Sequence, residues 1–328
     1  SILVLGPGLS SVPEIFLSAF LNWKEKKIFM IRVNNVVKTF GDFRALDGVN
    51  LHVRDGAIYG LVGPNGAGKS TIIRHITGIY KPDAGNIEIA GMPVYENPQA
   101  KARFAYIPDD LFYFQQADVM EMKRFYKGIY KTFDEDLFFR IRDAFSNIDP
   151  KMTIRRMSKG MQKQAAFWLA ISCRPELMIL DEPVDGLDPV MRRQIWSIIM
   201  SDVAEHGTTV LVSSHNLREL EDVCDHVGIM HHGKVMLERS LSELQGSVCK
   251  IQVAYQERMP KLPADFEVLH MSSTGRVYTM IVKGNPKEAK LRLEQTSPML
   301  IDVLPLTLEE IFIYELGGAD YAVKDILL

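Results

Sequence analysis

The stretch Gly63–Thr71 constrains this chain more than any other part of its sequence. It reads Gly-Pro-Asn-Gly-Ala-Gly-Lys-Ser-Thr, follows the apolar run Ala57–Val62, and enters a helix that we expect over Lys69–Gly78. A strand, a glycine-rich turn and a helix in this order place backbone N–H groups around an anion. The positive end of the helix dipole adds to that field. The pattern therefore predicts a phosphate-binding loop in an α/β fold.

This loop is expected to hold a nucleoside triphosphate together with its Mg²⁺ ion. Lys69 would reach the β- and γ-phosphates, and the hydroxyl of Ser70 would ligate the metal. The other predicted nucleotide contacts are Gly63, Pro64, Asn65, Gly66, Ala67, Gly68 and Thr71. A chance glycine turn is the competing interpretation, and the strand and helix on either side argue against it.

Two carboxylates end a second apolar strand, which we expect over Leu177–Leu180. Asp181 and Glu182 follow it directly, and ligands of open α/β sheets bind at such carboxyl ends of strands. Asp181 is expected to hold Mg²⁺ through water, because this hard cation prefers oxygen ligands. Glu182 is expected to polarise the water that attacks the γ-phosphate. Acidic residues often end strands without a catalytic role, so this interpretation depends on the phosphate loop upstream.

Composition and charge narrow the class of protein. Of the 328 residues, 47% are hydrophobic and 24% are charged, which permits a large core and argues against disorder. The formal net charge is −3 with both signs interspersed, unlike a strongly basic nucleic-acid-binding protein, so we predict no nucleic-acid partner. Cys173, Cys224 and Cys249 fit a reducing cytosol and no disulfide framework. No apolar stretch reaches the roughly 20 residues of a membrane span, so any membrane part is expected from another chain.

The order of the expected elements divides the chain into three parts. Residues 1–29 form an extension, which we interpret as an expression remnant, a start-site artefact or a membrane-surface segment. Residues 30–240 alternate strands with helices, which implies a mainly parallel sheet covered on both faces, with a helical subdomain over about residues 110–160. Residues 241–328 change pattern and predict a small α+β domain with a tail.

The elements expected in that last part follow from short apolar runs and one amphipathic segment. In chain order they are strands over Val248–Tyr255, Phe266–Leu269 and Val277–Val282, a helix over Pro286–Gln295, and a closing helix over Thr307–Leu316.

Three further motifs make the chain resemble the nucleotide-binding domains of ABC ATPases. Arg155–Gln162 precedes the carboxylate strand, Asp185–Pro189 follows it, and Ser213–His215 ends the next strand. The resemblance covers about Met30–Lys234 and extends weakly beyond. It implies a P-loop NTPase fold of the ABC type with a helical subdomain, ATP and Mg²⁺ as cofactors, and hydrolysis by a dimer.

The resemblance assigns further nucleotide contacts. Ser158 and Gly160 match the serine and second glycine of the family's LSGGQ signature, which contacts the γ-phosphate bound by the partner subunit. Lys159 lies between them and would add a positive charge near phosphate, or only alter the geometry. Phe40 falls where the family places an aromatic ring against adenine, and such stacking contributes about 1 kcal/mol.

The resemblance also completes the predicted catalytic set. His215 matches the switch histidine that contacts the γ-phosphate, and Asp188 matches the aspartate of the D-loop at the dimer interface. Together with Lys69 and Glu182, they form the catalytic residues that we expect. A pseudo-ATPase that binds ATP only as a clamp is an alternative supported by the altered signature, and the intact Lys69, Asp181, Glu182 and His215 argue against it.

Two departures from the family pattern affect these expectations. Lys159 and Met161 replace the first glycine and the glutamine of the signature, which leaves open a heterodimer with an ATPase subunit of different sequence. Tyr106-Ile107-Pro108 is followed by Asp109 where the family usually has glutamine. We expect Asp109 to contact Mg²⁺ or its water and to keep a sensing role with altered coupling.

Residues 111–150 hold ten of the thirty aromatic residues of the chain. These rings fill the core of a helical subdomain, form a groove for a helix of a membrane subunit, or do both. We expect Leu111–Tyr113, next to Asp109, to face that membrane partner.

The combined prediction is an ATP-binding and ATP-hydrolysing subunit of a membrane ABC transporter. It would work as a nucleotide-sandwich dimer with transmembrane permease subunits, in the cytoplasm and peripheral to the inner face of the membrane. Pro305–Phe312 resembles a closing segment of exporter ATPases, which favours export. A soluble ABC ATPase acting on ribosomes or DNA is the alternative. The single Gly-Lys-Ser loop and the absence of a long coiled-coil insertion argue against it.

Overall fold

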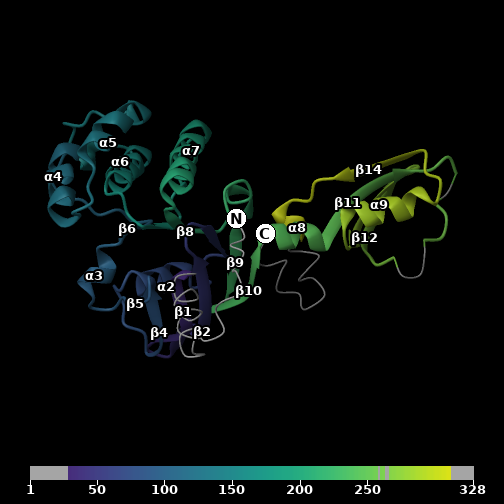
Figure 1. Ribbon diagram of the computed structural model, residues 1–328, viewed down its shortest axis with the longest axis horizontal. Coiled ribbons are helices and arrows are strands. Elements are labelled where there is room, and N and C mark those ends of the chain that lie inside the picture. The colour runs from purple at the N-terminus through teal and green to yellow at the C-terminus, as the bar shows by residue number, and fades with distance from the viewer. Residues whose placement is uncertain (1–28, 258, 263–265, 312–328) are drawn as a thin grey trace, which may run out of the picture.

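The computed structural model describes residues 29–257, 259–262 and 266–311 (Figure 1). The expectations for residues 1–28, and for the closing helix beyond residue 311, lie outside this part of the chain. Within the described residues, the strands form three sheets of four, six and four strands. The first two sheets and their helices lie together, and the third forms a separate lobe at the other end of the molecule.

The first sheet is antiparallel and is built on a long hairpin. Its order is β2-β1-β4-β5, with β1 (Phe29–Phe40), β2 (Phe43–Arg54), β4 (Ala84–Ile89) and β5 (Met92–Pro93). Phe40 pairs with Phe43 across the turn of this hairpin. Gly41 in this turn has a φ of 56°, a left-handed conformation that glycine adopts without a steric penalty.

The second sheet is mainly parallel, as the alternation of strands and helices predicts. Its order is β10-β9-β3-β8-β7-β6, and only β10 runs antiparallel to its neighbour among these described strands. The strands are β3 (Ile58–Val62), β6 (Phe104–Ile107), β7 (Leu177–Asp181), β8 (Thr209–Ser214), β9 (His226–His231) and β10 (Lys234–Ser240). All residues of β3, β7 and β8 are buried, which explains their continuous apolar runs.

Helices and 3-10 turns connect these strands. In chain order they are α2 (Lys69–Ile76), α3 (Pro98–Lys101), α4 (Val119–Ile129), α5 (Glu135–Arg140), η1 (Ile141–Phe145), η2 (Ile154–Arg156), α6 (Lys159–Ser172), α7 (Pro189–His206) and η3 (Leu217–Glu219). The predicted helical region is only partly helical, because residues 111–118 contain no helix. Asp118 and Glu121 form a capping box, so α4 begins after Asp118.

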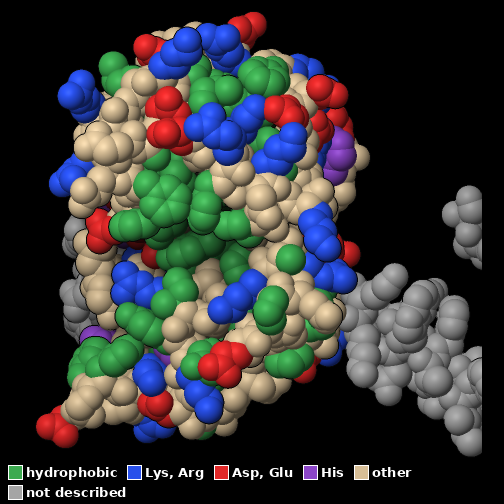
Figure 2. All heavy atoms as spheres, turned by 90° about the vertical axis from the view of Figure 1, so that its left-hand side faces the viewer, with side chains coloured by type: hydrophobic (Ala, Val, Ile, Leu, Met, Phe, Trp, Pro, Cys, Tyr) green, Lys and Arg blue, Asp and Glu red, His purple; other side chains and the backbone are tan. Residues whose placement is uncertain are grey.

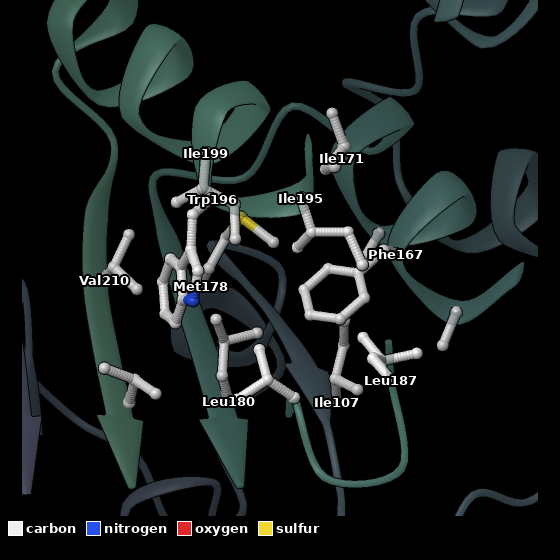
Figure 3. Close-up of a cluster of buried hydrophobic side chains, with 14 of the residues drawn as sticks. Ile107, Phe167, Ile171, Met178, Leu180, Leu187, Ile195, Trp196, Ile199 and Val210 are labelled. Atoms are coloured by element: carbon white, nitrogen blue, oxygen red, sulfur yellow. The ribbon is translucent and has the colours of Figure 1, made fainter. Parts of the chain in front are cut away.

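Side chains of the second sheet alternate between two hydrophobic clusters, one on each face. Met178 and Leu180 of β7 point toward α6 and α7, where they pack near Trp196 (Figure 3). Leu177 and Ile179 point to the opposite face, into a cluster shared with α2 and the first sheet. The two faces of one strand therefore hold the helices and the first sheet in fixed positions around it.

A stack of aromatic rings forms the core of the helical region. Trp168 of α6 stacks on Phe138 at 4.5 Å and on Phe145 at 5.8 Å between ring centroids. Its indole N–H donates to the carbonyl oxygen of Phe138 at 2.7 Å, so the buried polar edge of the ring is satisfied. These rings confirm the core interpretation of the aromatic stretch.

The third sheet has the order β12-β13-β11-β14 and is antiparallel throughout. This region contains α8 (Leu241–Ser247), β11 (Val248–Ala254), β12 (Val268–Thr274), β13 (Val277–Lys283), α9 (Pro286–Glu294) and β14 (Leu300–Leu304). Ala289 and Leu293 of α9 pack on Ile251 and Val253 of β11. The predicted strand over residues 266–269 is misplaced, because most of β12 is exposed and lacks an apolar pattern, and the short strand β14 was not predicted.

The chain returns from this lobe to the second sheet. Leu308 and Ile311 are buried in the same hydrophobic cluster as α6 and α7. The backbone N–H of Leu308 donates to Glu221 at 3.1 Å, and Arg218 donates two hydrogen bonds to Glu309, at 3.0 and 2.8 Å. The segment after β14 therefore contacts the turn that follows β8. None of the helices in the described part combines the length and apolarity that crossing a bilayer demands.

Glu238 of β10 is a partly buried acid between β10 and β2. Its Oε1 accepts a hydrogen bond from the backbone N–H of His52 at 3.3 Å. Burial raises the pKa of Glu238 to about 7, and the hydrogen bond from the backbone N–H of His52 lowers it only in part. The carboxylate of Glu238 therefore binds a proton more tightly in the folded protein than in the unfolded chain, where its pKa is near 4.5.

Because the folded pKa of Glu238 is raised, its contribution to stability is fully present below pH 4.5 and is lost as the pH rises through about 7. Glu238→Gln should therefore raise the free energy of unfolding at pH 8 by about 1–3 kcal/mol and change it little near pH 4.5. Urea denaturation at the two pH values measures both differences. An equal change at both values would show that ionisation of Glu238 is not the cause.

Candidate active site

The predicted phosphate loop connects the end of β3 to the start of α2. Gly66 and Gly68 have φ values of 82° and 107°, which L-amino-acid side chains rarely tolerate. Gly63 has a different constraint, because an added Cβ would lie 2.2 Å from the carbonyl oxygen of Met230 in β9. Two glycines therefore set the curvature of the loop, and the third allows it to approach the neighbouring strand.

The N-terminus of α2 fits an anion. Gly68 is its N-cap residue, no side chain caps it, and no acidic residue lies in the first turn. Backbone N–H groups at such a helix end lack partners within the helix and carry the positive end of the helix dipole. The loop therefore has the donors that a phosphate group requires.

Lys69 lies inside this loop and is only 5% exposed. Its Nζ donates to the carbonyl oxygens of Gly63 at 2.6 Å and Pro64 at 3.3 Å, and lies 3.2 Å from Oε1 of Glu182. The ammonium group thus joins the phosphate loop to the carboxylate at the end of β7.

The two predicted magnesium ligands of the sheet and loop are in direct contact. The hydroxyl of Ser70 donates to Oδ1 of Asp181 at 3.2 Å, and the hydroxyl of Ser213 donates to the same oxygen at 2.6 Å. Burial raises the pKa of Asp181, while these two hydrogen bonds lower it. Hydroxyl and carboxylate oxygens close together suit a hard cation such as Mg²⁺, whose charge would also offset the cost of burying Asp181.

Glu182 and His215 form a second pair beside the first. His215 Nδ1 lies 2.9 Å from Glu182 Oε2, and the backbone N–H of His215 donates to the same oxygen at 3.3 Å. Glu182 has a φ of 45°, an uncommon left-handed conformation for a residue with a side chain. Ligand atoms of Asp185, His215 and Glu182 all lie within 4.8 Å of one another. The structure therefore holds a carboxylate in a defined orientation next to Lys69.

The residues assigned to the signature and the D-loop lie at the starts of two helices. Ser158 caps α6 and accepts a hydrogen bond from the backbone N–H of Met161. Asp188 caps α7 and accepts bonds from the first two backbone N–H groups after Pro189, at 3.0 Å each. Gly160 approaches the loop between them, since an added Cβ would lie 3.2 Å from the carbonyl oxygen of Gly186. In the described chain, no hydrogen bond or ion pair joins Ser158, Lys159 or Gly160 to residues 63–71.

Phe40, the predicted adenine contact, is a partly exposed ring at the end of β1. It is 44% exposed, with the ring of Tyr80 at 5.7 Å and the ammonium of Lys38 at 5.5 Å from its centroid. The ring of Tyr80 in turn lies 5.6 Å from that of His75 in α2. A row of rings thus connects Phe40 to the helix that follows the phosphate loop.

Asp109 does not join the Ser70–Asp181 pair through a hydrogen bond within the described residues. Its side chain is 56% exposed, and its Oδ1 lies 3.4 Å from Nζ of Lys163. The same ammonium donates to the backbone carbonyl of Glu182 at 2.7 Å. The structure therefore places the predicted metal contact beside a lysine of α6.

The sequence reasoning gave no role to three residues near the site, Ser213, Asp185 and Lys163, although the first two lie within motifs that it named. Ser213 pairs with Asp181 in the register of β7 and β8, which a sequence motif alone does not show. Lys163 is a buried lysine in a helix that continues with apolar residues. The one available signal for Lys163 was its charge at the start of this apolar run, because lysine is almost never fully buried unless it is paired.

An exposed cluster of aromatic rings lies near the site, at the start of the helical region. Phe112 is 82% exposed, and its ring contacts Phe114, which contacts Phe125 of α4 at 4.9 Å. Figure 2 shows hydrophobic side chains gathered in a hollow on the side of the molecule that carries α4. Leu111 and Tyr113 both pack against the core, and Tyr113 donates to the carbonyl of Gln162 at 2.7 Å, whereas Phe112 is exposed; the contact of Leu111–Tyr113 with a membrane partner stays a prediction.

The fold and this loop define a P-loop nucleotide-binding protein. The family described as ABC transporter matches residues 46–185. The bacitracin transport ATP-binding protein BcrA of Bacillus licheniformis is 30% identical over 318 residues, which cover 88% of this chain and 98% of BcrA. The chain therefore belongs to the ATP-binding subunits of ABC transporters, a family of ATPases.

Two further similarities agree with this membership. The Nod factor export ATP-binding protein I of Sinorhizobium fredii is 32% identical over 222 residues, covering 66% of this chain and 64% of that protein. A solved structure of an ATP-binding subunit of an ABC transporter matches with a TM-score of 0.61 and 28% identity, over 66% of this chain and 92% of the other.

Gly63→Ala should lower the free energy of unfolding by about 2–4 kcal/mol, because its Cβ would overlap the carbonyl of Met230 and force the loop or β9 to shift. Gly66→Ala is the matched control: nothing lies within 4 Å of its added Cβ, and only its positive φ opposes alanine. That cost is about 1–2 kcal/mol. Chemical denaturation measures both changes, and equal losses would show that the Met230 contact does not constrain the loop.

Proposed function

We propose that this subunit hydrolyses Mg·ATP in a nucleotide-sandwich dimer and drives export through transmembrane permease subunits at the inner face of the cell membrane. The observation that carries the proposal is the contact between Lys69 and Glu182, with the Ser70–Asp181 pair beside it. A phosphate loop, two oxygen-bearing side chains suited to Mg²⁺ and an oriented carboxylate in one place support this proposal.

The proposed chemistry assigns a task to each group. Mg²⁺, when bound, would neutralise charge that develops on the phosphate oxygens, and Ser70 and Asp181 would hold it. Lys69 would exchange its bonds to the loop carbonyls for bonds to β- and γ-phosphate oxygens. Glu182 would orient the attacking water through one carboxylate oxygen. His215, whose Nδ1 lies 2.9 Å from Oε2 of Glu182, would hold that side chain in its orientation.

A dimer is proposed because the signature residues Ser158–Gly160 make no hydrogen bond or ion pair to the phosphate loop of their own subunit in the described chain. Ser158 and Gly160 lie at the N-terminus of α6, whose first turn contains no acidic residue. A helix end of this kind favours an anion. We assign its ligand as the γ-phosphate held by Gly63–Thr71 of the partner subunit, with Asp188 at the interface. Lys159, exposed in that first turn, would add positive charge there.

Export and the membrane partner are supported by separate observations. The relatives named above include proteins named for bacitracin transport and Nod factor export. The exposed rings of Phe112, Phe114 and Phe125 supply an apolar surface of the kind that marks a protein interface. We assign this aromatic cluster to the contact with the permease.

Glu182→Gln should reduce ATP turnover by at least about 100-fold while ATP binding persists, since the amide keeps the shape of the side chain but cannot act as a base. Saturating Mg·ATP should then convert the variant into a dimer on size-exclusion chromatography. Glu176→Gln is the control, because Glu176 is exposed and pairs with Arg103 at the opposite end of β7. A parent protein without turnover would contradict the proposed ATPase activity, as would a Glu182→Gln variant that turns over normally.

Replacing Phe112 and Phe114 together by serine should lower the amount of tagged protein in the membrane fraction at least about threefold, in cells that also produce the permease subunits. The reason is the loss of apolar area from the proposed interface. Leu291→Ser on α9 removes an apolar side chain that is 61% exposed from the other lobe and should change nothing. Unchanged membrane recovery of the double variant would place the permease contact elsewhere.

A further inference from the structure

Lys163 is a buried cation that the proposed chemistry does not use. It is 6% exposed, although lysine is almost never fully buried unless it is paired. Its Nζ donates to the backbone carbonyl of Glu182 at 2.7 Å and lies 3.4 Å from Oδ1 of Asp109. One ammonium group on α6 therefore joins the loops that follow two neighbouring strands, β6 and β7.

The bond to Glu182 acts on the backbone rather than the side chain. Glu182 has a left-handed φ of 45°, which a residue with a Cβ keeps only when its surroundings fix it. Its backbone N–H donates to Ser213 at 3.1 Å, so Ser213 and Lys163 hold the two polar groups of its main chain. The bond from Lys163 is charge-assisted and is therefore the stronger kind.

Asp109 faces this cation from the open side. Its side chain is 56% exposed, whereas that of Lys163 is 8% exposed. Both line a cavity of about 430 Å³, which Asp185 and Lys159 also line. Asp109 can consequently swing away into water, while Lys163 cannot leave Glu182 without leaving a buried charge unpaired. The position of the Asp109 carboxylate therefore determines how the Lys163 ammonium is shared between Asp109 and the backbone carbonyl of Glu182.

The position of Asp109 connects this pair to the aromatic cluster. Asp109 precedes Phe112 by three residues in a segment without regular secondary structure. A displacement of that segment would therefore move the carboxylate relative to Lys163. The same displacement would change the bond that Lys163 makes to Glu182.

The geometry points to Lys163 as a positioning residue for hydrolysis: it holds the backbone of Glu182 in its left-handed conformation, and Asp109 adjusts that hold by sharing the ammonium. This inference rests on the proposed ATPase function for its kinetic consequence. Its structural consequence, a tether between α6 and residue 182, does not require nucleotide.

The experiment compares Lys163→Met, Lys163→Arg and Asp109→Asn in the full chain. Lys163→Met should lower kcat at least about tenfold with KM for ATP within about twofold, because the tether positions Glu182 without touching nucleotide. Lys163→Arg keeps a donor and should recover most of that loss. Asp109→Asn should change kcat at least about threefold in the parent, but have no further effect in the Lys163→Met background, which is the sign of coupling.

A second readout uses nucleotide-free protein. Hydrogen exchange of the backbone amides in residues 182–187 should accelerate in Lys163→Met and return toward the parent rate in Lys163→Arg. Lys101→Met is the matched control, because Lys101 also donates to a loop carbonyl, that of Gly78 at 3.1 Å, but lies on α3. It should change neither kcat nor exchange in residues 182–187.

The outcomes separate this inference from the proposed function. A parent without ATP turnover would defeat the proposed function, and the exchange rates would still decide whether the tether exists. An active parent whose kcat and exchange are unchanged by Lys163→Met would overturn the tether and leave the ATPase intact. If Lys163→Met fails to fold, Lys163→Arg and Asp109→Asn decide: parental kcat and exchange in Asp109→Asn would overturn the role of Asp109.

Discussion

Asp181 is 2% exposed at the end of β7, and its carboxylate accepts hydrogen bonds from Ser70 of α2 and Ser213 of β8. A carboxylate in this environment is costly unless it is hydrogen-bonded or paired with a cation. The two hydroxyls therefore hold the phosphate-loop helix and two strands at one point. Glu182 is the next residue, so its backbone position is fixed along with that of Asp181. The rest of the site therefore depends on the hydrogen bonds that Asp181 accepts.

The buried sheet explains why that point is rigid. Residues of β7 alternate between the cluster beneath α6 and α7 and the cluster shared with α2 and the first sheet. A shift of one residue would exchange the two sets and bring side chains of a different shape into each close-packed cluster. The strand end that carries the carboxylates is thus fixed by packing on both faces, and Lys69 meets Glu182 at 3.2 Å as a result.

Local patterns predicted much of this arrangement. The phosphate loop, the carboxylate strand and the mainly parallel sheet followed from spacing and apolar runs, because each depends on residues close in sequence. The third sheet was predicted less well. Edge strand β12 is largely exposed and lacks an apolar pattern, and the short strand β14 is defined by its pairing with β11. The aromatic stretch was ambiguous for a similar reason, since Tyr113 and Phe112 are neighbours but only Phe112 faces solvent.

The sequence by itself determined which chemical groups are present and which stretches of backbone can form a phosphate loop, because glycine spacing and strand-helix order act over a few residues. Only the tertiary structure decided which distant groups meet. Ser213 reaches Asp181 across a strand register, and Lys163 reaches both Asp109 and Glu182 from a separate helix. The contact between Ser70 and Asp181 likewise joins residues 111 positions apart in the chain. These contacts are set by the packing of helices on the sheet, which no local motif specifies.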